Sequence, residues 1–342
     1  MRYHKILPFI WAKSRFMRFK ILVLVVIAGL AGCGKDTQKT SSTEPAKVVN
    51  VPAFNADSAY YFVQKQVDFG PRIPNTPAHK NAGDFLIAQF KTYGAAVKVQ
   101  EFTATTFDGK KVNLRNIIAS FDPEKKKRIL LAAHWDTRPF SDKDKEKPNS
   151  TFDGANDGAS GAGVLLEVAR NIRQQATDAG IDIILFDGED WGEKHGSEQP
   201  PLPENLKAWW CLGSQYWSTH KHIPNYSAYY GILLDMVGGK NSRFAFEAYS
   251  LEYAPSIVDK VWKTAARLGY SNTFVNVKDG NILDDHVFVN LNAKIPMIDI
   301  VSYDESGSFG DFHHTQKDNM SVISKETLNA VGQTLLQVIY YE

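Results

Sequence analysis

The sequence has few cysteines, little net charge and no long hydrophobic run. Its two cysteines, Cys33 and Cys211, in 342 residues exclude a scaffold held together by several disulfides. The formal net charge of +1 argues against a nucleic-acid-binding protein. The apolar run 21–31 is far shorter than the ~20 residues that a membrane-spanning helix needs. The composition, with 43% hydrophobic and 23% charged residues, is typical of a globular protein.

The N-terminal segment differs from the rest of the chain. Residues 1–32 contain six lysines and arginines and no acid, so the remaining 33 basic and 38 acidic side chains leave a net charge of −5. A basic start, a short apolar run and small residues predict a secretory signal peptide. Residues 30–33 read LAGC and resemble the bacterial lipobox, in which the cysteine is lipidated and becomes the mature N-terminus.

These features predict the location of the protein. We expect residues 1–32 to be a lipoprotein signal peptide and the mature chain to be exported and held on a membrane by a lipid on Cys33. The protein would then lie in the bacterial cell envelope, on the periplasmic side of a membrane or at the cell surface. An ordinary signal peptide with an incidental cysteine is the alternative. Met17, which opens the compact sequence MRFKILVL, is a second candidate for the start of the chain.

The remainder divides into a tether and one large domain. Residues 33–52 are polar and show no periodicity, which indicates a flexible tether. In residues 53–342, predicted strands alternate with predicted helices, after an initial hairpin through Asp108-Gly109. Alternation of this kind predicts an α/β protein, a single-domain α/β/α sandwich with a mixed, mostly parallel central sheet. The predicted strands span residues 97–105, 112–121, 128–134, 181–186, 229–235 and 296–301, and the helices span 58–67, 78–93, 157–175, 206–220, 254–268 and 324 onward.

Acids and histidines follow several of the predicted strands. In open α/β sheets, ligands bind beyond the carboxyl ends of the strands, so these residues are expected to meet at one edge. Crowded carboxylates repel one another unless a cation lies between them, and a mixture of histidine and carboxylate suits Zn²⁺ better than Mg²⁺. The residues concerned are His134, Asp136, Asp157, Glu189, Asp190, Asp235, Asp284, Asp285, His286, His313 and His314.

Local spacing suggests different roles for some of these residues. His134 and Asp136 lie two apart and therefore point to the same side of an extended strand. Asp157 precedes a predicted helix, whose free N–H groups would orient its carboxylate. Glu189 and Asp190 point in opposite directions, so that one is able to bind a metal while the other acts as a base.

The order of the motifs HWD, DGANDGASG, DGED, LDMVG and HHTQKD resembles the zinc aminopeptidase-type family of metallohydrolases. The resemblance implies the fold over nearly the whole domain. Two branches of the family are relevant, the two-zinc aminopeptidases and the glutaminyl cyclases with one zinc. The cyclases convert an N-terminal glutamine to pyroglutamate and release ammonia. The sequence resembles them in three features: the segment ILDDHVF with the later FGDFHHTQKDN, the aromatic-rich insertion after DGEDWG, and the extra acid Asp284.

The resemblance to the cyclases implies a set of residue roles. It implies an enzyme, a glutaminyl-peptide cyclotransferase, that acts on peptides or proteins with N-terminal glutamine. One zinc would be held by Asp157, Asp190 and His314. Glu189 would be the general base and acid, and Asp235 and Asp284 would form a hydrogen-bonded pair that shares a proton. The substrate pocket would include Trp191, Phe309 and His313, and His134 and Asp136 would bind a second metal or support the first site from behind.

The sequence also departs from the animal cyclases. Asp190 stands where many relatives have glutamate, Asp299 where the animal enzymes have histidine, and His313 where they have tryptophan. Two other functions stay open, a two-zinc aminopeptidase of the same fold and a non-catalytic lipoprotein that reuses the fold for binding. Elsewhere, we expect Cys211 to be a buried apolar residue and Asp142–Lys147 to be an exposed charged loop.

Overall fold

The computed structural model describes residues 49–302 and 309–342. The predicted signal peptide, Cys33 and most of the predicted tether therefore lie outside the described residues. The last residues of the predicted tether are described, and Val49 and Val51 pack against the core of the domain. Val48–Glu342 form one compact unit.

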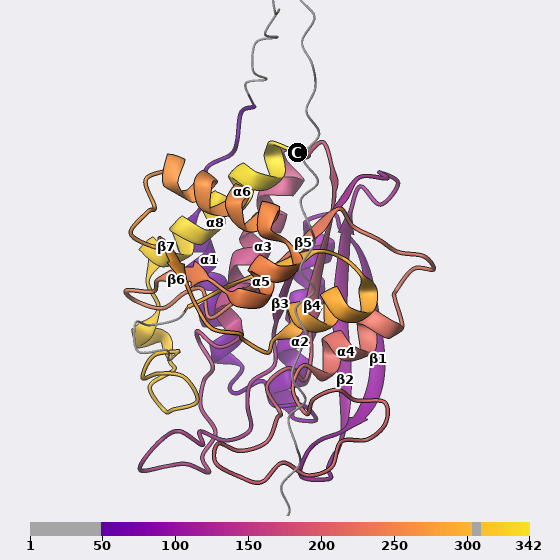
Figure 1. Cartoon of the computed structure of the whole chain (residues 1–342), viewed down its shortest axis with the longest axis vertical. Helices are drawn as coiled ribbons and strands as arrows, with labels where there is room; N and C mark the ends of the chain where they lie inside the picture. The colour runs from indigo at the N-terminus through magenta and orange to yellow at the C-terminus, as the bar shows by residue number, and fades with distance from the viewer. Residues whose placement is uncertain (1–48, 303–308) are drawn as a thin grey trace, which may run out of the picture. The chain divides into compact units, whose positions relative to one another are not determined.

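A six-stranded sheet runs through the centre of this unit (Figure 1). Its strand order is β1-β2-β4-β3-β5-β8. β1 and β2 form the predicted hairpin, and β2 is also antiparallel to β4, whereas β4, β3, β5 and β8 are mutually parallel. The predicted mixed, mostly parallel sheet is therefore confirmed. The strands are β1 Ala96–Thr105, β2 Lys111–Phe121, β3 Arg128–His134, β4 Gly180–Phe186, β5 Tyr230–Asp235 and β8 Met297–Val301.

Helices cover both faces of the sheet, as expected for an α/β/α sandwich. The larger apolar core lies between one face and helices α1, α2, α3, α6 and α8, and includes Leu131 and Ile183 from the central strands. On the opposite face, Trp217 of α4 and Val289 of a π-helical turn pack against Leu130 and Ile184. Every residue of β3 and β4 is buried, because helices cover both sides. The helices are α1 Ala56–Asp68, α2 Pro77–Thr92, α3 Ala159–Gln174, α4 Leu212–Thr219, α5 Ala248–Tyr253, α6 Pro255–Arg267, α7 Asp285–Phe288 and α8 Lys325–Tyr340, and the π-helical turn is Val289–Ala293.

The structure differs from the sequence prediction in a few elements. The helix expected from residue 206 begins at Leu212, because Cys211 takes a left-handed backbone conformation with φ 58° that a helix does not continue. A second, two-stranded sheet of β6 (Phe244–Phe246) and β7 (Phe274–Lys278) was not predicted, since β6 has three residues and shows no recognisable alternation. No helix in the described ranges is long and apolar enough to cross a membrane.

Candidate active site

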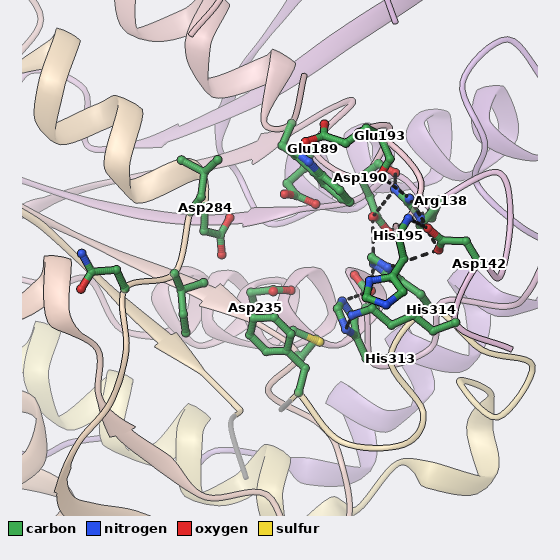
Figure 2. Close-up of a pocket in the computed structure, with 18 residues that line it drawn as sticks. Arg138, Asp142, Glu189, Asp190, Glu193, His195, Asp235, Asp284, His313 and His314 are labelled. Atoms are coloured by element: carbon green, nitrogen blue, oxygen red, sulfur yellow. Dashed lines mark hydrogen bonds and ion pairs between the residues drawn. The ribbon is translucent and has the colours of Figure 1, made fainter. Parts of the chain in front are cut away.

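Three neighbouring parallel strands deliver the central residues of the site. His134 is the last residue of β3 and Asp235 is the last residue of β5. Glu189 and Asp190 follow β4 after a turn at Gly188, whose φ of 71° favours glycine. Since β3, β4 and β5 are parallel neighbours, these side chains meet at one edge of the sheet. Glu189, Asp190 and Asp235 line a common cavity there (Figure 2).

Asp157 reaches the same cavity from the loop before α3. The Asp318 carboxylate accepts hydrogen bonds from the backbone N–H groups of Asn156 (2.7 Å) and Asp157 (3.1 Å) and so holds this loop. Buried Arg72 donates to the Gly154 carbonyl of the same loop at 2.7 Å. Sequence reasoning missed Asp318, although it lies in the HHTQKDN motif, because its partners are backbone groups distant in sequence.

His314 lies close to both Asp157 and Asp190, the two other residues predicted to hold zinc, and donor atoms of Asp157, His313 and His314 also lie close enough to hold an ion. His314 Nε2 lies 3.1 Å from Asp190 Oδ1 and 3.5 Å from Asp157 Oδ2. Donor atoms about 2.0–2.2 Å from a tetrahedral ion lie about 3.3–3.6 Å apart, which is close to these separations. Both carboxylate oxygens are buried and have no hydrogen-bond partner among the described residues.

Each of these two carboxylates uses its other oxygen as an anchor. Asp157 Oδ1 lies 3.0 Å from His134 Nε2, and Asp190 Oδ2 accepts a hydrogen bond from the Arg138 backbone N–H at 3.2 Å. Burial, and then the charge of Asp157, raise the pKa of Asp190 well above its usual range. Burial lowers the pKa of His314 to about 3, so its imidazole is neutral at pH 7 and able to bind a metal. A neutral imidazole beside two buried carboxylates is a donor set that suits a metal cation.

His134 carries a second set of acid contacts. Its Nε2 lies 3.0 Å from Asp157 Oδ1 and 3.2 Å from Asp235 Oδ1, and its Nδ1 lies 3.6 Å from Asp136 Oδ1. Burial opposes the charged form, but these carboxylates raise the pKa of His134 well above its usual value. Donor atoms of His134, Asp157 and Asp235 lie close enough to hold an ion of their own. Asp136 accepts from the backbone N–H groups of Glu189 (3.1 Å) and Asp190 (3.3 Å), and it therefore supports the acid loop.

Glu189 has the environment of a general base. Burial raises the pKa of Glu189 well above its usual value, with the charges of Asp190 and Asp284 adding to the shift and that of His134 opposing it. Its Oε1 accepts a hydrogen bond from the Cys211 thiol at 3.3 Å, and its Oε2 lies 3.9 Å from His134 Nδ1. Cys211 is buried, as predicted.

Asp235 and Asp284 face the cavity from β5 and from the cap of α7 (Figure 2). Burial raises the pKa of Asp235 to about 7, although its hydrogen bond with His134 opposes the shift. Burial also raises the pKa of Asp284. Asp299 lies behind Asp284, and burial together with the charge of Asp284 raises its pKa well above the usual range. The proton shared between Asp235 and Asp284 stays a prediction.

Aromatic and basic side chains complete the cavity, which has a volume of about 400 Å³. Phe309 and His313 line it, and the tryptophan among its described lining residues is Trp210. Trp191 instead packs in a small apolar cluster with Val112, Leu114 and Leu212. At the rim, the Lys143 ammonium donates to His313 Nδ1 at 2.6 Å.

Asp142 was expected to lie in an exposed charged loop, and the structure shows that this prediction is wrong for its side chain. Its side chain is only 4% exposed, because it binds the guanidinium of buried Arg138. Although burial opposes the shift, the hydrogen bond and charge of Arg138 lower the pKa of Asp142 to about 2. Neither residue was predicted, since no periodicity or motif in the sequence pairs an arginine after a strand with an acid in the next loop.

Comparisons with known proteins agree with this geometry. Residues 116–339 match the model of peptidase family M28. The chain is similar to a Bacteroides thetaiotaomicron glutaminyl cyclase bound to N-acetylhistamine, with 50% identity over 86% of this chain and 100% of that one and a TM-score of 0.82. It is also similar to a Zn-dependent exopeptidase from Parabacteroides distasonis, with 53% identity over 85% and 99% of the chains and a TM-score of 0.82. A glutaminyl-peptide cyclotransferase of Dictyostelium discoideum is 25% identical over 77% of this chain and 78% of its own length.

Proposed function

Because this chain belongs to peptidase family M28, we propose that its cavity is the active site of a zinc-dependent glutaminyl-peptide cyclotransferase. The substrate is the N-terminal glutamine of a peptide or protein, and the products are pyroglutamate and ammonia. The observation that carries the proposal is a buried carboxyl group of raised pKa, Glu189, next to the convergent donor atoms of Asp157, Asp190 and His314.

The residues of the cavity hold the substrate glutamine so that its own α-nitrogen is able to react with its side-chain amide. The acids of the cavity attract the positive α-ammonium group, and the walls formed by Trp210 and Phe309 exclude water, which would otherwise hydrolyse the side-chain amide to glutamate. Holding the glutamine folded places its nitrogen near its own γ-carbon, and such proximity supplies much of the acceleration. Asp157, Asp190 and His314 would hold the zinc ion, which would supply Lewis-acid chemistry at the γ-carboxamide.

Glu189 moves the proton that the reaction requires. The bound α-ammonium group first loses one proton to solvent. The Glu189 carboxylate then accepts a proton from the neutral α-amine, whose nitrogen forms a bond to the γ-carbon as the five-membered ring closes. The protonated Glu189 then donates that proton to the nitrogen of the breaking γ-carbon–nitrogen bond, and ammonia leaves. Burial raises the pKa of Glu189, which makes its carboxyl group a better proton acceptor than an exposed glutamate. Asp284 faces Glu189 across the cavity and steadies the leaving nitrogen (Figure 2).

An assay with two substrates tests this function. The domain should release ammonia from Gln-peptides, should lose this activity with a chelator, and should release no p-nitroaniline from Leu-p-nitroanilide. Glu189→Gln should lower kcat at least about 100-fold, because the proton carrier is lost, while one zinc per chain is retained. Liberated p-nitroaniline with two metals per chain would instead favour an aminopeptidase that uses the His134, Asp157 and Asp235 cluster. If neither ammonia nor p-nitroaniline is released, the result would favour a binding protein.

We also propose that the enzyme works on a membrane of the cell envelope. The basic start, the apolar run 21–31 and the LAGC sequence support export and a lipid on Cys33. Cells that express the wild-type chain should incorporate radiolabelled palmitate into it, and the protein should enter the detergent phase of a Triton X-114 extraction. Cys33→Ser should abolish both, whereas Cys211→Ser should change neither. Labelling of the Cys33→Ser chain would contradict the anchor.

A further inference from the structure

Arg138 stands out among the buried side chains because its guanidinium lies between two aromatic rings. The group is fully buried, 4.4 Å from the centre of the Phe140 ring and 4.6 Å from that of the Trp210 ring. Burying a charge is costly unless it is paired and hydrogen-bonded. Here the Asp142 carboxylate supplies the pair, with Nε donating to Oδ1 at 2.9 Å and Nη2 donating to Oδ2 at 2.7 Å.

All five N–H groups of this guanidinium have partners. Besides the two bonds to Asp142, Nη1 donates to the carbonyls of Asp190 (3.1 Å) and Gly192 (3.3 Å), and Nη2 donates to the carbonyl of Glu193 (3.0 Å). The chain from Asp190 to Glu193 is thus held by one side chain. The Arg138 backbone N–H adds a bond to Asp190 Oδ2, which leaves Oδ1 directed toward His314.

Arg138 also acts on His314, through Asp142. Asp142 Oδ1 lies 3.6 Å from His314 Nδ1, on the side of the ring opposite the metal-facing Nε2 (Figure 2). Metal-binding histidines commonly direct their second nitrogen to a carboxylate, which sets the ring orientation and makes the ligand more basic. The Trp210 ring lies parallel to the His314 ring, with 6.0 Å between the ring centres, and it also lies 4.6 Å from the Arg138 guanidinium. Trp210 therefore connects Arg138 with one face of the His314 ring.

We infer that Arg138 is a positioning residue that orients two of the three zinc ligands, Asp190 directly and His314 through Asp142. The inference rests on the proposed zinc site. Arg138 reaches the zinc site through its ligands, with Nη1 3.7 Å from Asp190 Oδ1, and its effect is on how tightly zinc is held. A lysine would keep the charge, but its three donors have no planar fork and cannot replace five fixed N–H groups.

The chain offers a matched control in Arg128. Its guanidinium is also buried and makes the same two-point contact with a carboxylate, Asp182, through Nε (2.5 Å) and Nη2 (2.7 Å). Arg128 is the first residue of β3, however, whereas the site lies beyond the last. Arg128→Lys and Arg138→Lys therefore lose equivalent ion pairs, but only Arg138→Lys disturbs the zinc ligands.

Zinc affinity, measured by competition with a chromophoric chelator on the purified full chain, tests the inference. Arg138→Lys should raise the zinc dissociation constant about 10–100-fold, the usual effect of losing a residue that orients ligands. Arg128→Lys should leave this constant unchanged, while both variants lose a similar amount of thermal stability. Asp142→Asn, which keeps the shape of the side chain but removes its charge, should also weaken zinc binding, and it replaces Arg138→Lys if that variant does not fold.

Two results would overturn the inference. The first is an unchanged zinc dissociation constant in Arg138→Lys. If Arg138→Lys does not fold, the same result in Asp142→Asn counts instead. The other is an equal loss of affinity in Arg128→Lys, which would make the effect one of general stability. If the wild-type chain binds no zinc, the proposed zinc site is wrong. This outcome is visible in the titration of the wild-type protein, before any variant is compared with it.

Discussion

Asp299 is a buried acid whose surroundings disfavour its ionised form. It is 1% exposed, and neither carboxyl oxygen has a hydrogen-bond partner among the described residues. Because burial and nearby acids raise its pKa in the folded state, it keeps its proton there at pH values at which the unfolded chain has lost it. Its contribution to stability is complete below pH ~4 and is lost as the pH rises toward the folded-state pKa.

Asp299→Asn should therefore stabilise the metal-free protein at neutral pH. Asparagine is similar in shape but cannot ionise, so the variant avoids a cost of about 1.4 kcal/mol for each unit by which folding raises the pKa. Thermal unfolding in a chelator should show the gain of Asp299→Asn over wild type increasing between pH 4 and pH 7. Asp182→Asn is the control, since Asp182 is equally buried but bound to Arg128, and it should destabilise the protein at pH 7. A gain that is the same at both pH values would contradict this account.

The acids of the site could be predicted from the sequence more readily than the residues that hold them. His134 and Asp235 end buried strands and Glu189 follows one closely, and strand patterns are visible in the residues themselves. Arg138 and Asp142 act through loops whose conformation depends on the whole fold. Trp191 was predicted to line the substrate pocket because it follows the acid pair directly in the sequence. The structure places its side chain in a neighbouring apolar cluster, and Trp210 lines the cavity instead.

At the scale of elements, the contact of α3 with the sheet places Asp157. Gly161 lies in the first turn of α3, and a Cβ atom there would come within 2.4 Å of the Leu234 carbonyl oxygen of β5 and 2.9 Å of the Ala133 Cβ of β3. The helix can approach the strands this closely only because the residue has no side chain. Asp157 lies four residues earlier, in the loop that leads into α3.

Gly161→Ala should reverse the usual effect of this substitution. In an open helix, alanine is about 1 kcal/mol more favourable than glycine, whereas overpacking in a close contact costs about 1–3 kcal/mol. Urea unfolding should show net destabilisation. Asn81→Ala, at an exposed position on α2, should be neutral or slightly stabilising under the same conditions. A more stable Gly161→Ala variant would show that α3 can move away from the strands.

The long elements were predictable because their patterns are long, and the short ones were not. β3 and β4 are continuous apolar runs that lie where the sequence places them. By contrast, the beginning of α4 depends on the left-handed conformation of Cys211, and the β6–β7 sheet depends on contacts between segments about 30 residues apart. Neither feature has a local signal that sequence reasoning is able to use.

Over the whole domain, negative charge is gathered at one edge of the sheet and is balanced there. The part of the chain after residue 32 carries a net charge of −5, and several of its acids are buried around the cavity. His134 and two of the buried arginines, Arg72 and Arg138, offset some of this charge, and zinc would offset more when bound. The excess of acid is visible in the sequence, and the zinc site that would use it stays a prediction. The arginines that share in the balance were not predicted.

The size of the cavity sets an order of events. A space of about 400 Å³ admits the first residue of a chain while the rest of that chain stays outside. The nitrogen that closes the ring must also be a free amine, which a glutamine inside a polypeptide does not have. Cyclisation therefore comes after the cleavage that exposes the glutamine, and a pyroglutamate end is a record that this cleavage has already taken place. A protein with an N-terminal pyroglutamate made in this way has therefore been cleaved by a protease first.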